Sequence, residues 1–249
     1  MPTDIQSLDD LNQEQLVQFL LEAFHRTVIH YGLWFRETEY QMGLKSAMQA
    51  DDKVFSTSLG IQMKRLAKLL GFEVDEKGVP LRIKQMSPEE LKELIKSQTV
   101  NWLANDGVWF QTVENMENMN TAKRLNDTCW THYSPYEAER IKIFLGLGEN
   151  SGLAGLRTAL NFRNYARVNL QSIHEISENS FEFQMNDCRV QSARKRKGLP
   201  DYPCLSVGEV EYAYFARSID SRIVTECVGC PPGDHPEEWY CAWRFTLKE

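Results

Sequence analysis

The chain has 249 residues, of which 42% are hydrophobic, and a formal net charge of −7 at pH 7. A chain of this length and composition can bury a full hydrophobic core, as one large domain or as two ordinary ones. The negative charge disfavours nonspecific attraction to nucleic acids or acidic membranes, so we expect neither as a partner, and the short basic run at residues 194–197 is expected to be a solvated turn.

The start of the chain is polar and acidic, and it lacks the basic and apolar regions of a signal peptide. No window of the sequence approaches the run of about 18 apolar residues that a membrane span needs. We therefore expect a cytoplasmic protein. In a reducing compartment, clustered cysteines bind metal or carry out redox chemistry more often than they form stable disulfides.

Up to about residue 165, apolar residues recur every three or four positions, which is the period of amphipathic helices. Two local signals mark helix starts, at Ser87 and Ser134, where the serine can cap a helix and a proline follows at the first helical position. Glu90 and Glu137 then stand at the capping-box position. We expect residues 1–165 to form a helical domain.

An internal duplication is visible within this helical region. At a constant offset of 75 residues, "YGLWFRETEYQMGLKSAMQADD" aligns with "DGVWFQTVENMENMNTAKRLND", and the register continues to Arg65 and Arg140. We infer two copies of a helix pair, at residues 20–71 and 95–146. Because each pair must bury an apolar face, the two pairs are expected to pack about a pseudo-twofold axis.

The repeat supplies candidate site residues. Glu39 and Glu114 occupy equivalent positions, one turn beyond Trp-Phe pairs that contain Trp34 and Trp109. A twofold arrangement would bring the two carboxylates into a shared cavity beside an aromatic wall. There they could bind a cation or serve as acid and base.

Arg65 and Arg140, which are also equivalent in the repeat, leave two interpretations open. In an enzyme, Glu39 or Glu114 would be the base and an arginine would hold an anionic group of the substrate. Alternatively, the arginines and glutamates form structural salt bridges, since buried charges are usually paired. His30 has no counterpart in the second copy and is expected to be a helix-face residue rather than a ligand.

After residue 167 the pattern changes to alternating, β-rich runs. Strands are expected at residues 168–176, 180–185, 222–227 and 239–247, and a helix at 207–219. The expected fold class is therefore α+β, with a helical N-terminal bundle that contains the duplication. A small domain of antiparallel sheet and helix, residues 166–249, follows it.

Four cysteines of this second domain are candidate metal ligands: Cys204, Cys227, Cys230 and Cys241. Four thiolates fill a tetrahedral shell, which favours a structural zinc ion, although an iron-sulfur cluster needs the same number. Two of these cysteines, separated by two residues, can reach one ion from a tight turn. Cys188 is a possible substitute ligand.

The order of these cysteines and elements resembles the four-vinyl-reductase-type domain, which is related to the ligand-binding fold of nitric-oxide-sensing and Golgi-transport proteins. In the phenol-sensing transcription activators, that domain holds zinc with three cysteines and a glutamate. The resemblance places Cys204, Cys230 and Cys241 at the cysteine positions and Cys227 where the glutamate would be.

Three segments, "DCRVQSARKRKGLPDYPC", "CVGCPPGDHP" and "DGVWFQTVE", also resemble an uncharacterised family of bacterial cytosolic proteins. That family is distantly similar to aminothiazoline-carboxylate hydrolases, but the resemblance supplies no activity. Cys129, in the helical region, is expected to be a buried core residue.

These observations favour a zinc-stabilised protein that binds or senses a small molecule, with the ligand in an apolar pocket between the helical part and the sheet. Two alternatives stay open. One is a hydrolase acting on a small carboxylated heterocycle, and the other is an iron-sulfur protein. The sequence does not give the identity of the ligand or the oligomeric state.

Overall fold

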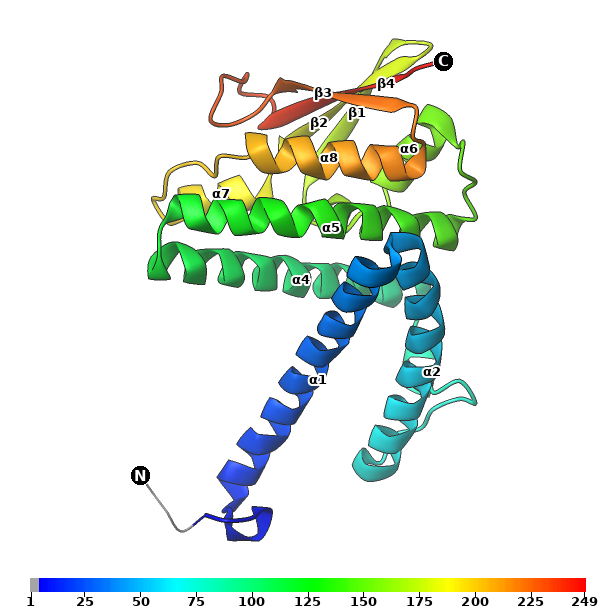
Figure 1. The fold of residues 1–249 in the computed structure, drawn as a ribbon, viewed down its shortest axis with the longest axis vertical. Helices are drawn as coiled ribbons and strands as arrows, with labels where there is room; N and C mark the ends of the chain where they lie inside the picture. The colour runs from blue at the N-terminus through cyan, green and yellow to red at the C-terminus, as the bar shows by residue number, and fades with distance from the viewer. Residues whose placement is uncertain (1–4) are drawn as a thin grey trace. The chain divides into compact units, whose positions relative to one another are not determined.

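The computed structural model describes residues 5–249, and the chain divides into two compact units (Figure 1). Unit 1 ends at Lys84 and unit 2 spans Gln85–Glu249. The α+β fold class is confirmed, because the long helices come first and one antiparallel sheet lies near the C-terminus. Among residues 5–249, no helix combines the length and the apolar character needed to cross a membrane.

Unit 1 is built on a helical hairpin. A short helix, η1 (Leu8–Asp10), precedes α1 (Gln13–Met42) and α2 (Leu44–Leu70), and α3 (Leu81–Lys84) follows. Asn12 caps α1 through a hydrogen bond that its side chain accepts from the Gln15 backbone N–H at 3.0 Å. Gly43 allows the turn between the two long helices, because its φ of 80° is readily adopted only by glycine.

Unit 2 contains the other helices: α4 (Pro88–Met116), α5 (Met119–Leu145), α6 (Gly152–Leu160), η2 (Asn164–Arg167), α7 (Arg189–Arg196) and α8 (Leu205–Ile219). The predicted helix start at Ser87 is confirmed, with the reciprocal hydrogen bonds of a capping box between Ser87 and Glu90.

The predicted helix start at Ser134 is wrong. Ser134 and Pro135 lie inside α5, and both are buried. The long contact between α5 and α8 stabilises a continuous helix, which outweighs the local preference of a Ser-Pro pair for a helix start. Glu137 forms no capping box with Ser134, because its carboxylate pairs with Arg163 and accepts a hydrogen bond from the Asn164 backbone N–H at 3.0 Å.

The sheet has the order β1-β2-β4-β3, and all neighbouring strands are antiparallel. Its strands are β1 (Leu170–Ser177), β2 (Ser180–Asp187), β3 (Ile223–Gly229) and β4 (Cys241–Leu247). The four predicted strands and the predicted helix, α8, are all present. The basic run at residues 194–197 is not a solvated turn throughout, because Arg194 is a buried residue of α7.

Within unit 2, the sheet lies on α8, α8 packs on α5, and α5 packs on α4 (Figure 1). Alternate residues of β2 and β4 point into the core, among them Phe181, Phe183 and Trp243. Gly208 lets α8 approach the sheet closely, because a Cβ atom at this position would lie 2.3 Å from a ring carbon of Trp243.

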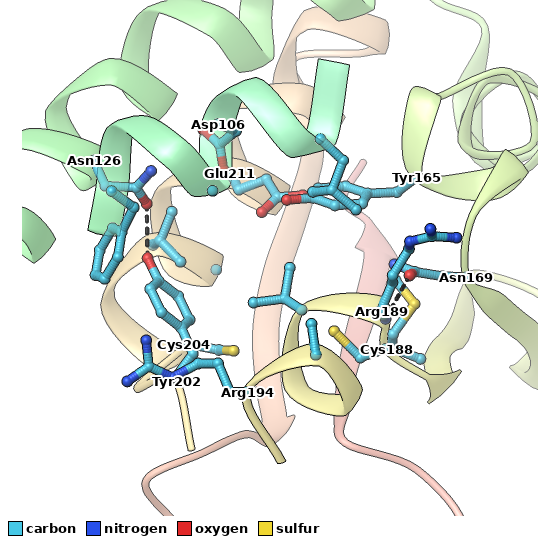
Figure 2. Close-up of a pocket in the computed structure, with 18 of the residues that line it drawn as sticks. Asp106, Asn126, Tyr165, Asn169, Cys188, Arg189, Arg194, Tyr202, Cys204 and Glu211 are labelled. Atoms are coloured by element: carbon cyan, nitrogen blue, oxygen red, sulfur yellow. Dashed lines mark hydrogen bonds between the residues drawn. The ribbon is translucent and has the colours of Figure 1, made fainter. Parts of the chain in front are cut away.

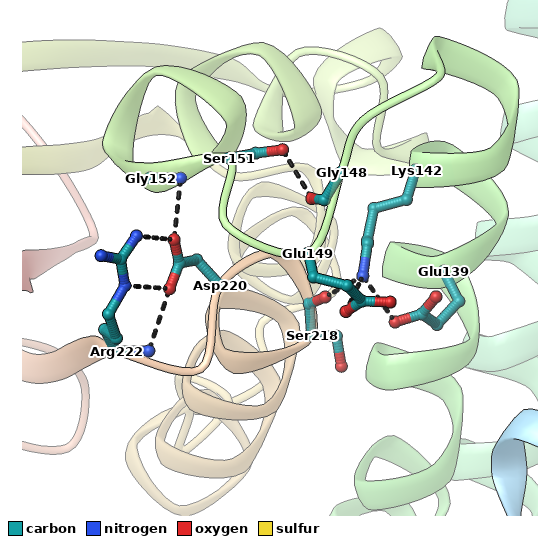
Figure 3. A network of polar contacts seen from close by, with 9 residues as sticks. All are labelled: Glu139, Lys142, Gly148, Glu149, Ser151, Gly152, Ser218, Asp220 and Arg222. Carbon is teal, nitrogen blue, oxygen red and sulfur yellow. Dashed lines mark hydrogen bonds and ion pairs between the residues drawn. The ribbon is translucent and has the colours of Figure 1, made fainter.

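Two charged side chains connect helix ends within unit 2 (Figure 3). Lys142, near the end of α5, donates a hydrogen bond to the Ser218 carbonyl of α8 at 2.8 Å. Asp220, directly after α8, accepts one from the Gly152 backbone N–H at 3.0 Å and pairs with Arg222 at 2.8 Å. Hydrogen bonds from Arg222 lower the pKa of Asp220 to about 2, so this carboxylate is ionised at neutral pH.

The helix boundaries follow the period of the predicted duplication. α4 and α5 begin 75 residues after α1 and α2, and Gly71 and Gly146 end α2 and α5 in the same left-handed conformation. The first helix pair belongs to unit 1 and the second to unit 2. Packing of the two pairs about a twofold axis, and the domain boundary near residue 165, therefore stay predictions.

Candidate functional site

A cavity of about 370 Å³ lies inside unit 2. Its walls come from α4, α5, α7, α8, β2 and β4, together with the segments that precede and follow α7 (Figure 2). Most of the lining is apolar or aromatic. The aromatic side chains that line it are Phe110, Trp130, Tyr165, Tyr202, Tyr212 and Trp243.

The aromatic walls are ordered by contacts with one another. The rings of Trp130 and Tyr165 stack with centroids 5.7 Å apart and an interplanar angle of 12°. Tyr212 stacks on Trp243 at 5.0 Å, and Phe110 meets Tyr202 edge-on at 5.0 Å. Such contacts fix the ring planes, and the cavity therefore has a defined shape before any ligand binds.

The segment between α7 and α8 is held by a buried amide. Gln191 is fully buried, and its side chain bonds both backbone groups of Tyr202, donating to the carbonyl at 2.8 Å and accepting from the N–H at 2.9 Å. The same amide donates to the sulfur of Cys204 at 3.2 Å. The Tyr202 hydroxyl in turn donates to Asn126 at 2.7 Å, which connects the segment to α5.

A buried arginine lies between two glutamates beside the cavity. Arg163 donates from Nε to Glu137 at 3.0 Å and from Nη2 to Glu211 at 2.5 Å. Its guanidinium also lies over the rings of Tyr212 and Phe215. Burial raises the pKa of Glu211, although the charge of Arg163 opposes this effect. The guanidinium of Arg163 thus forms ion pairs with two carboxylates, and one of them, Glu211, lines the cavity.

Asp106 lines the cavity from α4 without a partner of its own. Among residues 5–249, no side chain or backbone group forms a hydrogen bond or ion pair with its carboxylate. Burial raises the pKa of Asp106 to about 6, because a charged carboxylate loses hydration in apolar surroundings. Asp106 is therefore mostly ionised at pH 7 but protonates readily under mild acid.

The four predicted cysteine ligands are in contact through Cys230. The thiol of Cys230 is hydrogen bonded with the sulfurs of Cys204 and Cys241, and these bonds together with burial raise the pKa of Cys230 well above its usual range. Cys227 is hydrogen bonded with Cys230 and does not line the cavity. Cys188 lies near Cys204 and Cys241, and burial raises the pKa of its thiol.

These thiols do not form a ready metal site. Within the described part of the chain, no group of three or more Cys, His, Asp or Glu side chains is arranged to hold a metal ion. The four-thiolate zinc or iron-sulfur site therefore stays a prediction. Cys129, predicted to be buried, is exposed.

The candidate residues of the repeat lie outside this cavity. Glu114 pairs with Arg194 at 3.4 Å and Glu39 with Arg36 at 3.2 Å. Glu39 belongs to unit 1 and Glu114 to unit 2, so their shared cavity stays a prediction.

The other four candidates of the repeat do not line the cavity either. Trp34 and Trp109 are 66% and 61% exposed, so neither forms an aromatic wall of an enclosed site within its own unit. Arg65 lies on an exposed stretch of α2, and Arg140 is half-buried in α5. The roles of these arginines stay predictions.

A protein-family model described as a family of unknown function (DUF6125) matches residues 9–84 and 82–247. The chain belongs to family DUF6125. No curated protein matches this DUF6125 chain. A solved structure, the phenol-responsive sensory domain of the transcription activator PoxR with phenol, is similar with a TM-score of 0.38 and 15% sequence identity. That match covers 74% of the DUF6125 chain and 88% of the sensory domain.

The resemblances of this DUF6125 chain to the four-vinyl-reductase-type domain and to aminothiazoline-carboxylate hydrolases stay predictions. Sequence reasoning missed Asp106, Arg163 and Glu211, which come from three separate elements. For Asp106 the sequence does hold one weak signal, because it follows Leu103 by three positions and so lies beside the apolar face of α4. For Arg163 and Glu211 we find no such signal.

Proposed function

We propose that this protein binds a small organic molecule in the cavity of unit 2. The observation that carries the proposal is the cavity itself, whose volume of about 370 Å³ and largely apolar lining with several aromatic side chains are typical of small-molecule sites. Its polar groups are few and come from different elements, which is how such sites orient a ligand.

The chemistry of the lining favours binding over catalysis. Burial raises the pKa of the Cys188 thiol, which opposes formation of a nucleophilic thiolate. Arg163 and Glu211 are engaged with each other, so neither is free for proton transfer. A hydrolase that uses Glu39 or Glu114 remains the alternative from the sequence. Glu114 does not line the cavity itself and is engaged in an ion pair with Arg194, which does.

Structural zinc bound by the cysteines is a second proposal. What supports it is the contact of the Cys230 thiol with Cys204 and Cys241, which places three of the four predicted ligands at the junction of α8 with the sheet. Cys227 would supply the fourth thiolate, and an iron-sulfur cluster is the alternative occupant. Zinc would add folding energy to this junction, and it would be held at the wall of the cavity, which Cys204, Cys230 and Cys241 line.

Filling the cavity tests the binding proposal. Ala193 lines the cavity from α7, so Ala193→Phe is expected to occupy part of the space that a ligand needs. Ala154→Phe adds the same ring to an exposed position of α6 and serves as the matched control. Single-ring aromatic probes, benzyl alcohol and benzylamine, are expected to raise the melting temperature of the parent and the control but not of Ala193→Phe.

Both variants must show the circular dichroism spectrum of the parent, so that lost binding is not lost folding. Equal stabilisation of all three proteins by the probes would place binding outside the cavity. No stabilisation of the parent by either probe would count against the proposal.

A further inference from the structure

One side of the cavity carries more negative than positive charge. Asp106 and Glu211 both line it, and Glu211 shares Arg163 with Glu137. Two carboxyl groups therefore share one guanidinium, and the Asp106 carboxyl, which faces Glu211, adds a negative charge that Arg163 does not pair with. Figure 2 shows Asp106, Glu211 and Tyr165 along the same side of the pocket, away from Cys188.

Asp106 is the carboxyl group that this arrangement leaves unpaired. Arg163 is engaged by the two glutamates, and no other cation within residues 5–249 pairs with Asp106. A partly buried carboxylate with no partner is costly, because it has lost hydration without gaining a hydrogen bond or an opposite charge. A ligand that brings a positive charge would remove that cost.

The aromatic walls favour the same kind of ligand. The faces of aromatic rings attract cations, and this attraction grows where water is excluded. Trp130 and Tyr165 stack in the cavity lining, and Tyr165 lies on the same side of the pocket as Asp106 of α4 (Figure 2). A cation held by Asp106 would thus meet aromatic surface as well as a carboxylate.

The cations that line the cavity come from the opposite region, α7 and the residue after it. Arg194 pairs with Glu114, and Lys197 and Arg189 are exposed, so water screens their charges. In Figure 2, Arg189 and Arg194 lie across the pocket from Asp106. They do not neutralise the acidic side.

We infer that the ligand of this cavity carries a protonated nitrogen, an organic ammonium group next to an apolar or aromatic body, and that the carboxylate of Asp106 binds it. The inference rests on the proposed function, since it assigns the chemistry of the same cavity. Asp106 is the anchor for the charge, and the aromatic walls hold the body of the ligand.

Binding of such a ligand depends on pH through Asp106. The titratable groups that face Asp106 are Glu211 on α8, Tyr165 in η2, Tyr202 before α8 and Cys129 on α5. Neither tyrosine ionises near pH 6, because burial raises the pKa of both above the usual range. With a pKa of about 6, Asp106 loses its charge as the pH falls from 7.5 to 5, and affinity for an ammonium group falls about tenfold.

The experiment compares two probes of nearly equal shape, benzylamine and benzyl alcohol, of which only the first is charged at neutral pH. Calorimetric titration of the full chain uses the parent, Asp106→Asn and Asp234→Asn, the last being an exposed aspartate of the same unit. In the parent and in Asp234→Asn, benzylamine is expected to bind more tightly than benzyl alcohol. In Asp106→Asn, benzylamine affinity is expected to fall about ten- to a hundredfold, while benzyl alcohol affinity stays the same.

Three results would overturn the inference while leaving the proposed function standing. The first is equal affinity of the parent for both probes, with binding of both lost in Ala193→Phe. The second is unchanged benzylamine affinity in Asp106→Asn, and the third is no weakening of benzylamine binding to the parent between pH 7.5 and 5. If neither probe binds the parent, the proposed function fails together with the inference.

Discussion

Replacing Asp106 by asparagine is expected to stabilise the ligand-free protein at neutral pH. The pKa of this carboxyl rises from 3.8 in an unfolded chain to about 6 in the fold, because burial disfavours its charged form. A shift of about two pKa units corresponds to about 3 kcal/mol at most. Asparagine has nearly the same size and helix propensity but no charge to desolvate, so it removes this cost.

The sign of the effect follows from proton binding. Between about pH 4 and pH 6 the native state binds more protons at Asp106 than the unfolded state does, so stability falls as the pH rises through this range. Below about pH 4 the carboxyl is protonated in both states and costs nothing. We therefore expect Asp106→Asn to gain about 2–3 kcal/mol at pH 7.5 and nothing near pH 3.5.

Urea unfolding between pH 3.5 and 8, followed by tryptophan fluorescence, measures the difference between Asp106→Asn and the parent. Asp234→Asn serves as the control, because Asp234 is exposed in the same unit and its replacement should change little at any pH. A gain of equal size at pH 3.5 and pH 7.5 would refute the reasoning, since the effect would then not depend on ionisation. No gain at pH 7.5 would mean that the carboxylate has a partner after all.

Three further substitutions test other parts of unit 2. Arg163→Met leaves two buried carboxylates without their cation and is expected to cost about 3–5 kcal/mol in urea unfolding, so a cost under about 1 kcal/mol would contradict the pairing. Gly208→Ala places a methyl group against Trp243 and should cost about 1–3 kcal/mol, whereas Gly107→Ala, in open space on α4, should cost nothing. If the cysteines hold zinc, Cys230→Ser should lose the metal and unfold at a lower temperature than the parent. Metal analysis of both proteins, purified under reducing conditions, tests this expectation. A parent protein without metal would count against zinc.

Local patterns predicted the secondary structure where local preference and packing agree. The Ser-Pro signal at Ser87 marks the start of α4, where the serine caps an end that nothing else covers. The same signal at Ser134 failed, because there α5 continues along α8 and Glu137 is drawn to Arg163. A dipeptide cannot indicate which neighbouring helix will pack against it.

The site was less predictable than the fold. The spacing of the cysteines did place Cys204, Cys230 and Cys241 in one region, because a hairpin brings the ends of its strands together. The unpaired state of Asp106 could not be read from the sequence. It depends on Arg163 already being occupied by two glutamates that come from other helices.

The buried amide of Gln191 has a further consequence for how the cavity and the cysteines influence each other. One side chain holds the Tyr202 backbone, which forms part of the cavity wall, and also contacts the sulfur of Cys204. A ligand that shifts Tyr202 therefore also changes the contact between Gln191 and Cys204. A change in the chemical state of Cys204 likewise changes the hydrogen bonds that hold Tyr202 in the cavity wall. Such linkage is reciprocal. The free energy by which ligand binding changes the state of Cys204 equals the free energy by which the state of Cys204 changes ligand binding. Gln191 thus connects the Tyr202 backbone to Cys204, which itself lines the cavity.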